Sequence, residues 1–320
     1  MSKIQTLRKL WHSDKTAILT ACFNNLNNLG LFRWMSDKPF LSMAYYMHTG
    51  RKMHWKHPER FTEKIQWLKL YDRKEEYTRM VDKITAKEYV AERIGNEYII
   101  PTYGVWEHFD DIDFDALPEQ FVLKTSNGSG SNGVVVCTNK QMLDKKKAKK
   151  MLEASLKCNT YSNLREWPYK NIKPRIFAEQ FITETNIDTA RKDLTDYKFY
   201  CFGGKPKYCQ VIQNRSTKES IEFYDENWAL QPFVGLNPQA MRGEGNTPRP
   251  LYYDKMLEIA GKLSEGRDFV RVDLYTAGEM SLFGEVTFYP ASGLGRFNPD
   301  EYDKLLGELL KIQPVGGGKI

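Results

Sequence analysis

The order of elements along the chain predicts a mixed fold, α/β in its first part and β-rich α+β towards its end. Three observations indicate this. Stretches with helical spacing alternate with short apolar runs up to residue 182. A glycine-rich stretch at residues 121–137 joins two runs that are typical of strands. Two further pairs of strand-like runs, at 197–212 and 269–288, are each joined by a glycine-containing turn.

Length and composition exclude several classes of protein. The chain has 320 residues, enough to bury a large core in roughly two or three lobes. Apolar residues make up 41% and charged residues 28%, as in an ordinary globular protein. Its five cysteines form no Cys-x-x-Cys pair. The start of the chain lacks the apolar core of a signal peptide. No apolar run approaches the roughly 20 residues that cross a bilayer. We therefore expect a cytosolic protein with reduced cysteines.

Positive charge is concentrated near the start of the chain. The net charge is +6, but residues 1–75 hold 14 Lys and Arg against 6 Asp and Glu, which gives +8 and leaves −2 for the remainder. The same segment is rich in aromatic residues, which we expect to pack against the rest of the protein. The alternative is peripheral contact with the inner face of a membrane, because a basic, aromatic face can lie on anionic lipid. Nothing in the segment resembles a nucleic-acid-binding module, so we expect no nucleic-acid partner.

Helical periodicity predicts three helices before residue 95. In the first, Ile18, Cys22 and Leu26 fall on one face. The third carries Lys83 and Lys87, which are one turn apart and therefore share a face. In chain order the predicted elements are helices at 3–36, 61–75 and 78–94, then short strands at 98–101 and 104–106.

The glycine-rich stretch is predicted to be a β-hairpin with a flexible tip. Residues 121–123 are apolar and 134–136 are β-branched, so both indicate strands. Gly128, Gly130 and Gly133 match the pattern Gly-x-Gly-x-x-Gly, but dinucleotide-binding loops and P-loops need a helix next, and here a strand follows. A protein kinase is excluded as well, because the chain has no His-Arg-Asp or Asp-Phe-Gly.

A hairpin of this kind has two interpretations. Its backbone N–H groups can cradle phosphates, and Lys124, at the end of the first strand, would add a positive charge. Alternatively, its glycines and serines form a mobile surface hairpin.

The remaining elements are predicted from periodicity and turn residues. They are a helix at 142–157, a loop at 159–174, a strand at 176–182, a loop at 183–195, a hairpin at 197–212, a helix at 253–263, a hairpin at 269–288 and a helix at 301–312.

The last hairpin brings carboxylates together. Alternation places Arg271 and Asp273 on one face of its first strand, and Glu285 and Thr287 on one face of its second. If the turn is centred near Glu279, Asp273 lies opposite Glu285 with Cβ atoms about 5 Å apart, where like charges are unfavourable unless something neutralises them. A magnesium ion held with nucleotide phosphates would do so. Arg271 acting as a counter-ion in an ordinary hairpin is the alternative.

Taken in chain order, these features resemble an ATP-grasp enzyme. The order is Lys83, Lys124 with its glycine hairpin, Glu179, Arg271 with Asp273, and Glu285. The chain is most similar to the TupA-like (teichuronopeptide biosynthesis) branch, through segments 63–72, 165–175 and 284–290 and through Phe297-Asn-Pro. The resemblance covers roughly residues 55–312. Thr287 departs from the wider superfamily, which usually has an asparagine as the last metal ligand.

The resemblance implies a nucleotide site, a magnesium site and a catalytic arginine. The ATP-binding residues that it implies are Lys83, Lys124, Ser129, Gly130, Ser131, Asn132, Gly133, Glu179, Gln180, Phe181 and Ile182. The lysines would contact the phosphates, the glycine hairpin would close over them, and the strand ending at Ile182 would hold the adenine. The implied magnesium ligands are Asp273, Glu285 and Thr287. The implied catalytic residues are Arg271, which would stabilise the acyl phosphate and the tetrahedral intermediate, and Lys124.

The implied fold is an ATP-grasp fold, α/β (α+β), with a helical N-terminal extension. Its expected parts are a basic, aromatic helical extension at 1–75, an N-terminal α/β lobe at 76–117, a central lid lobe with the glycine hairpin at 118–182, and a C-terminal lobe with the metal-binding hairpin at 183–320.

The implied function is that of an ATP-dependent carboxylate–amine ligase that uses ATP and Mg2+. Its expected partners are an amino acid or amine and a glycan or sugar-uronate acceptor of a bacterial surface polysaccharide, such as a capsule, an O-antigen or a teichuronic-type glycan. One alternative is a glycosyltransferase that binds a nucleotide-sugar through an Asp-x-Asp motif. Asp111, Asp113 and Asp115 match the spacing of that motif, but we interpret this stretch as a solvated turn. The other is a non-catalytic scaffold whose basic N-terminus binds glycan or membrane.

Overall fold

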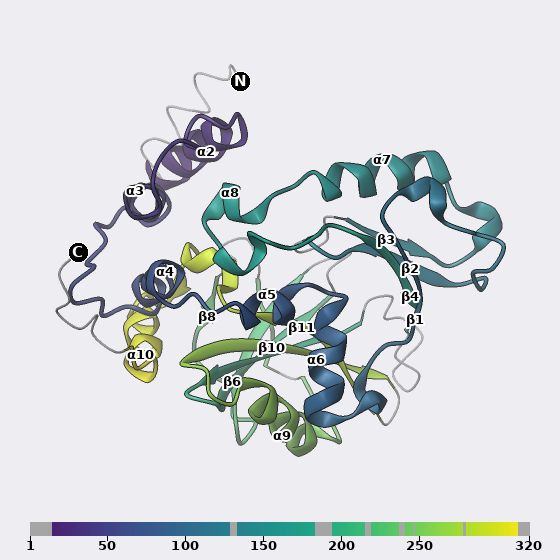
Figure 1. The fold of residues 1–320 in the computed structure, drawn as a ribbon. Helices are drawn as coiled ribbons and strands as arrows, with labels where there is room; N and C mark the ends of the chain where they lie inside the picture. Colours follow the sequence, from purple (N-terminus) through teal and green to yellow (C-terminus); the bar gives the residue numbers. More distant parts are fainter. Residues whose placement is uncertain are drawn as a thin grey trace, which may run out of the picture.

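The computed structural model describes residues 15–128, 133–182, 194–214, 219–236, 241–245, 247–277 and 280–312. Within these ranges the strands form a four-stranded, a six-stranded and a two-stranded sheet. In Figure 1 the four-stranded sheet and helix α7 (Lys145–Leu156) lie above the six-stranded sheet, while α2 (Lys15–Asn28) and α3 (Asp37–Thr49) lie at the upper left. Helices and antiparallel sheets are mixed, as the sequence predicts, and a helical N-terminal segment is present.

The four-stranded sheet has the order β1-β4-β2-β3 and is antiparallel throughout. Its strands are β1 (Thr102–Trp106), β2 (Phe121–Thr125), β3 (Val134–Cys137) and β4 (Ile176–Gln180). β2 and β3 pair with Lys124 opposite Val134, so the predicted glycine hairpin is confirmed. Phe121 and Leu123 are buried in one cluster with Leu152 of α7. The predicted tip residues Ser129, Gly130, Ser131 and Asn132 lie outside the described residues.

The six-stranded sheet has the order β11-β10-β5-β6-β7-β9. Its strands are β5 (Asp196–Phe202), β6 (Lys205–Gln213), β7 (Ser220–Asp225), β9 (Met241–Arg242), β10 (Phe269–Ala277) and β11 (Met280–Thr287). The two predicted hairpins, β5–β6 and β10–β11, are confirmed. β10 also pairs with β5, which places Lys198 opposite Asp273. The predicted helix α9 (Tyr253–Ser264) packs against this sheet through Met256, Ile259 and Leu263.

The first predicted helix is wrong in its extent. In place of one helix at 3–36, α2 ends at Asn28 and α3 follows where no helix was predicted. Phe23, Phe40 and Tyr45 fill the core between these two helices, because their rings are fully buried. The same cluster contains Leu294, which lies outside the N-terminal segment, so the expected packing against the rest of the protein is confirmed for these three.

The helix predicted at 78–94 is two helices, α5 (Glu76–Val81) and α6 (Thr85–Ile94). Asp82 accounts for the break, because its side chain accepts hydrogen bonds from backbone N–H groups two and three residues later, at 2.8 and 3.3 Å. Lys83 lies in the break, and its N–H donates to the carbonyl oxygen of Ser126. The prediction that Lys83 shares a helical face with Lys87 was therefore wrong.

Two further predictions differ from the structure. The strand predicted at 98–101 is replaced by the 3-10 turn η1 (Asn96–Tyr98) and irregular chain. The loop predicted at 159–174 contains the helix α8 (Thr160–Leu164) and the 3-10 turn η4 (Trp167–Tyr169). The other elements are α4 (Phe61–Tyr71), η2 (Phe109–Asp111), η3 (Lys140–Met142), β8 (Val234–Gly235), η5 (Pro290–Gly293), β12 (Phe297–Asn298) and α10 (Glu301–Leu309).

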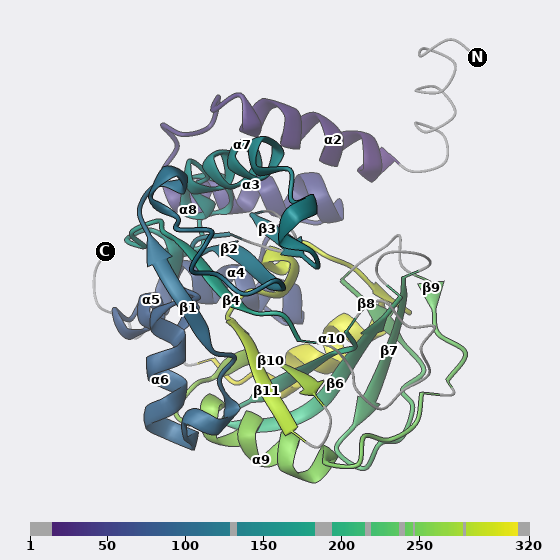
Figure 2. The ribbon, with the colours of Figure 1, turned by 90° about the vertical axis from the view of Figure 1, so that its right-hand side faces the viewer.

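The largest buried cluster joins α4, α5, α6 and α9 to the six-stranded sheet. In Figure 2, α9, β10 and β11 lie below the four-stranded sheet. Asp303 ties α10 to α4, because its carboxylate accepts hydrogen bonds from the N–H and hydroxyl of Thr62, at 2.9 and 2.8 Å. All five cysteines are free, as expected. In the described part of the chain, no helix has both the length and the apolar character that a membrane span requires.

Candidate functional site

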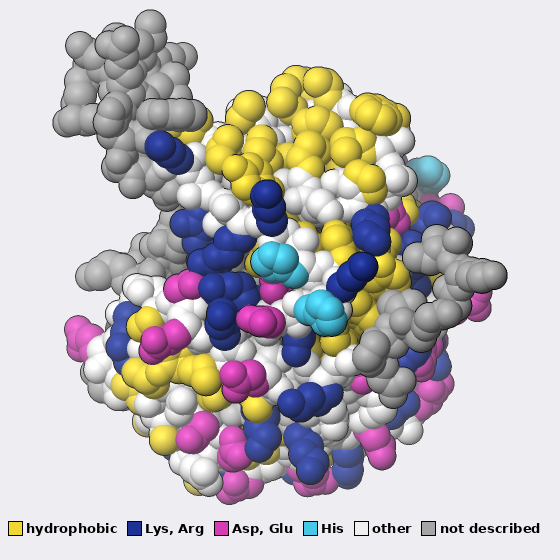
Figure 3. All heavy atoms as spheres, turned by 90° about the vertical axis from the view of Figure 1, so that its left-hand side faces the viewer, with side chains coloured by type: hydrophobic (Ala, Val, Ile, Leu, Met, Phe, Trp, Pro, Cys, Tyr) yellow, Lys and Arg dark blue, Asp and Glu magenta, His cyan; other side chains and the backbone are white. Residues whose placement is uncertain are grey.

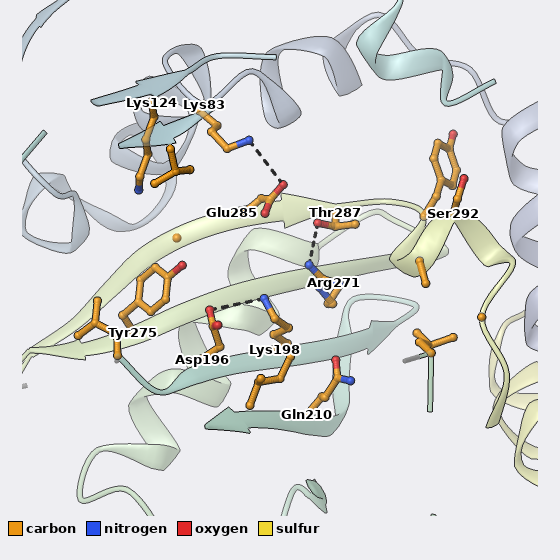
Figure 4. A pocket seen from close by; sticks show the side chains of 18 of the residues that line it. Lys83, Lys124, Asp196, Lys198, Gln210, Arg271, Tyr275, Glu285, Thr287 and Ser292 are labelled. Atoms are coloured by element: carbon orange, nitrogen blue, oxygen red, sulfur yellow. Dashed lines mark hydrogen bonds and ion pairs between the residues drawn. The ribbon is translucent and has the colours of Figure 1, made fainter. Parts of the chain in front are cut away.

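A cavity of about 1620 Å3 lies between the four-stranded and six-stranded sheets. In Figure 4, Lys124 lies at one end and Ser292 at the other, with Arg271 and Thr287 between them. The predicted site residues that line the cavity are Lys83, Lys124, Glu179, Gln180, Phe181, Ile182, Arg271, Glu285 and Thr287. The structure therefore brings together residues from distant parts of the sequence.

Two lysines share the carboxylate of Glu179 at the β2–β4 end of the cavity. Glu179 is 3% exposed, and its Oε2 accepts from the Nζ of Lys87 at 3.0 Å. Its Oε1 accepts from the Nζ of Lys124. Burial alone would raise the pKa of Glu179, but the two ammonium groups lower it below its ordinary value. The two lysines and one carboxylate leave a net positive charge facing the cavity.

Lys83 joins the glycine hairpin to β11. Its Nζ donates to the carbonyl oxygen of Gly128 and lies 4.0 Å from Oε1 of Glu285, an approach drawn in Figure 4. The break between α5 and α6 makes this possible, because it turns Lys83 out of the helical path. A third cation therefore faces the cavity, beside the hairpin.

Gly133 has a structural reason to be glycine. Its φ is 77°, and a Cβ atom there would overlap Oγ of Ser155 and Oγ1 of Thr125. Those two hydroxyls share a hydrogen bond of 2.7 Å between α7 and β2. Gly133 is buried and lies outside the cavity lining, so it allows the close contact between the hairpin and α7.

Asp273 and Glu285 are directly opposite each other on β10 and β11, as the sequence predicts. Asp273 is 1% exposed and accepts two hydrogen bonds of 2.7 Å from Arg271. The Nε of Arg271 donates to Oδ1, and its Nη2 donates to Oδ2. Lys198 also donates to Oδ2. Burial would raise the pKa of Asp273, but these cations lower it below its ordinary value. In this structure Arg271 and Lys198 neutralise the buried carboxylate.

The second carboxylate, Glu285, is more accessible. Its side chain is 23% exposed and faces the cavity. The neighbouring Thr287 hydroxyl accepts a hydrogen bond of 3.1 Å from Arg271. Mg2+ is usually bound by one or two carboxylates together with substrate phosphates.

Glu285 and Thr287 offer oxygen atoms that fit a magnesium ion. Asp273 would become a ligand only if Arg271 or Lys198 turned away, because its oxygens are buried and already bonded. No cluster of three or more His, Cys, Asp or Glu suited to a metal occurs among the residues that the structure describes. A bound nucleotide would therefore have to supply the remaining ligands.

Several charged residues near the cavity were not predicted as site residues. Lys198 and Lys87 pair with the two buried carboxylates, Asp273 and Glu179. Lys69 and Glu166 lie in the segments 63–72 and 165–175 that carried the resemblance, and their place in those segments is the sequence signal that could have drawn attention to them. Lys198 gave no such signal, because only the β5–β10 pairing places it opposite Asp273.

The acidic turn of the glycosyltransferase alternative lies elsewhere. Asp113 and Asp115 are exposed, and the Asp113 carboxylate accepts from the N–H groups of Asp115 and Ala116, at 3.0 and 3.3 Å. This is a solvated turn of the predicted kind. Neither Asp111 nor Asp113 lines the cavity.

A protein-family model described as TupA-like ATPgrasp matches residues 63–311. A comparison with curated proteins finds no match. Solved structures similar to the chain include the D-alanine–D-alanine ligase of Bacillus anthracis, at 16% identity over 66% of this chain and 58% of that one, with a TM-score of 0.40. The corresponding ligase of Helicobacter pylori is 13% identical over 79% of this chain and 70% of that one, with a TM-score of 0.40.

A RimK domain ATP-grasp protein of Sphaerobacter thermophilus is 12% identical over 73% of this chain and 69% of its own, with a TM-score of 0.37. The match therefore spans 58% of the length of the Bacillus anthracis ligase, less than two thirds of it.

Proposed function

The chain belongs to the TupA-like ATP-grasp family, in an enzyme class that uses ATP and Mg2+ for ligation, and we propose that it joins a carboxylate to an amine. In the proposed reaction a substrate carboxylate attacks the γ-phosphorus of ATP, which gives an acyl phosphate and ADP. The amine then attacks the acyl carbon. The C–N bond forms, the C–O bond to phosphate breaks, and inorganic phosphate leaves.

The observation that supports this proposal most strongly is the gathering of cationic side chains around one cavity. Lys83, Lys124 and Arg271 come from three separate parts of the sequence and all line it. Phosphoryl transfer needs positive charge on the phosphates and a site that excludes water. In the proposal Lys83 and Lys124 hold the ATP phosphates.

Arg271 has the geometry to bind an oxyanion. Its Nε and Nη2 form a fork that already holds the two oxygens of Asp273. A phosphate or acyl phosphate presents oxygens of the same arrangement, so Arg271 would turn from Asp273 towards the reacting group. Arg271→Lys keeps the charge and removes the fork, and we expect lower turnover with ATP binding nearly retained.

Magnesium would be held mainly by Glu285, with Thr287 beside it and Asp273 joining when Arg271 releases it. When bound, the ion would offset the negative charge of the phosphates. Lys83 lies 4.0 Å from Glu285, so the same carboxylate also orients a phosphate-binding lysine.

The proposed substrates are a uronic-acid carboxyl of a bacterial surface glycan and an amino acid or other amine. This pair rests on the resemblance to the TupA-like branch. The size of the cavity supports two substrates besides ATP, since drug-sized ligands occupy sites of roughly 300–1000 Å3 and this cavity holds about 1620 Å3.

A thermal-shift experiment separates the ligase from its two alternatives. We expect ATP with Mg2+ to raise the melting temperature, by an amount equivalent to about 2.7 kcal/mol at one hundred times the dissociation constant. A UDP-sugar should have little effect. Stabilisation by the UDP-sugar alone would favour a glycosyltransferase, and no effect of either ligand would favour a scaffold.

We further propose that the turn between α2 and α3 contacts a membrane surface. Leu29, Leu31 and Trp34 are 75%, 50% and 83% exposed there, beside the exposed Arg33 and Lys38. Figure 3 shows hydrophobic side chains at the top of this face of the molecule, above a group of Lys and Arg side chains. Exposed apolar side chains with basic neighbours suit anionic lipid.

The membrane proposal is tested by co-sedimentation with vesicles. We expect binding to vesicles that contain phosphatidylglycerol and much weaker binding to phosphatidylcholine alone. Trp34→Ser should reduce it, whereas Met142→Ser, which changes an equally exposed apolar residue on another surface, should not. Equal binding by wild type and Trp34→Ser would contradict the proposal.

A further inference from the structure

The end of the cavity remote from Lys124 contains a carboxylate without an ion pair. Glu166 lies between α8 and η4, is 8% exposed, and lines the cavity. Within the described ranges, no lysine, arginine or histidine forms an ion pair with it. Burying a charge is costly unless a partner offsets it. Glu166 therefore has the capacity to accept hydrogen bonds from a cationic ligand.

Lys69 supplies a compensating charge but no hydrogen bond to Glu166. It is fully buried, and its Nζ donates to Leu164 O at 3.0 Å, Ser292 O at 2.8 Å and Ser292 Oγ at 2.5 Å. An ammonium group has three donors, so all of them are used. Burial raises the pKa of Glu166, and the Lys69 charge and the Ser292 hydroxyl partly offset this effect.

The backbone beside Glu166 is held in a strained conformation. Ala291 and Ser292 have φ values of 45° and 57°, which are unfavourable for residues other than glycine. Gln66 of α4 holds this turn, because its Nε2 donates to the carbonyl oxygens of Ser292 and Gly293 at 2.9 and 2.8 Å. Strain that the surroundings maintain in this way is typical of ligand-binding sites.

A half-buried arginine lines the same end of the cavity. The Nη2 of Arg296 donates to the carbonyl oxygen of His48 at 3.1 Å, and no carboxylate in the described ranges forms an ion pair with it. Glu166 and Arg296 are also not paired with each other. Among the described residues, this end of the cavity therefore presents one carboxylate and one guanidinium that form no ion pair.

Ser292, whose hydroxyl acts on the pKa of Glu166, lies on the side of Arg271 that faces away from Lys124. Figure 4 shows Arg271 between Lys124 and Ser292, and the charges of Glu285 and Arg271 both act on the pKa of Glu166. A ligand bound at Glu166 would therefore reach the proposed reacting centre from the side opposite the nucleotide. Two small residues of α2, Ala17 and Ala21, also line the cavity.

We propose that the amine substrate is an amino acid, with its ammonium group bound by Glu166 and its carboxylate by Arg296. This inference rests on the proposed ligase function. Both contacts would be charge-assisted hydrogen bonds, which are the stronger kind. Lys69 and Ser292 are positioning residues, since they hold the Glu166 carboxylate and the strained turn in place.

The test compares two nucleophiles. Hydroxylamine is uncharged near neutral pH and needs no ammonium site, so it reports the acyl phosphate alone. We expect Glu166→Gln to form hydroxamate at the wild-type rate while its KM for the amino acid rises roughly 10- to 100-fold. Glu166→Asp, which keeps the charge but retracts it, should show an intermediate KM. Glu219→Gln, which changes another carboxylate that lines the cavity, should match wild type.

The carboxylate half is tested with pairs such as glycine and methylamine. Wild type should prefer the amino acid, and Arg296→Met should lose that preference by roughly 10-fold or more. An unchanged KM in Glu166→Gln, or loss of hydroxamate in a folded Glu166→Gln and Glu166→Asp, would overturn the assignment. No hydroxamate from wild type would overturn the ligase function itself.

Discussion

Replacing Glu179 with glutamine tests the cluster of two lysines and one carboxylate on β2, β4 and α6. Glutamine keeps the size and shape of the side chain and removes the charge that Lys87 and Lys124 share. The side chains of Glu179, Lys87 and Lys124 are only 5%, 15% and 23% exposed, so water would replace the lost charge poorly. Two ammonium groups would then face each other without a counter-ion.

The distance gives the size of the effect. Unit charges 3.0 Å apart, as in the Lys87–Glu179 pair, interact by about 5.5 kcal/mol at an effective dielectric constant of about 20. Removing one partner of a buried ion pair costs about 3–5 kcal/mol in practice. We expect Glu179→Gln to lower the free energy of unfolding by this amount, measured by urea unfolding followed through tryptophan fluorescence.

The pH dependence of this difference has a definite sign. The lysines lower the pKa of Glu179 in the folded state, against the raising effect of burial. The carboxylate therefore stabilises the folded state fully above the ordinary Glu pKa of about 4.3, and its contribution disappears as the pH falls through the lower folded-state value. The gap between wild type and Glu179→Gln should shrink only below about pH 4.3. A gap under about 1 kcal/mol at neutral pH would refute the reasoning.

Three further changes probe the rest of the site. Lys124→Met should remove the stabilisation by ATP and Mg2+ in a thermal-shift assay. It should lower the stability of the free protein less than Glu179→Gln does, because Glu179 keeps its ion pair with Lys87. An unchanged effect of ATP would exclude the phosphate-binding role of Lys124. Glu285→Gln and Asp273→Asn should both weaken magnesium-dependent turnover more than nucleotide binding. Only Asp273→Asn should lower the melting temperature, because the Asp273 carboxylate is buried between two cations. Wild-type turnover in both variants would contradict the magnesium site. Gly133→Ala should lower the free energy of unfolding by more than about 1 kcal/mol in urea, since its backbone conformation and its contacts exclude a Cβ; an unaffected midpoint would show that the hairpin can shift.

The hairpins were predictable because the residues that determine each of them lie close together in the sequence. The glycine stretch joins two strand-like runs, and a turn expected near Glu279 led to the pairing of Asp273 with Glu285. The chain order of these motifs also led to the family. Register and motif order depend on residues that are close in sequence, which is where sequence patterns are most informative.

The partners of the buried charged residues were not predictable, because partner residues lie far apart in the sequence. Lys198 reaches Asp273, 75 residues further along the chain, through the pairing of β5 with β10, which alternation within either strand does not specify. The split at Asp82 was missed because the side chain of one aspartate competes with the helical backbone inside an otherwise helical pattern. Glu166 and Lys69 looked like surface charges, and only the fold shows that they are buried.

The most direct test of the ligase proposal is the stoichiometry of its products. Purified protein would be given ATP, Mg2+, a panel of uronic-acid glycans and a panel of amino acids, and ADP, inorganic phosphate and amide would be measured together. The proposal predicts that ADP and phosphate appear in step with amide, only when both acceptor and amine are present, and that Arg271→Lys loses all three together. Transfer of a sugar from a nucleotide-sugar without consumption of ATP would contradict it.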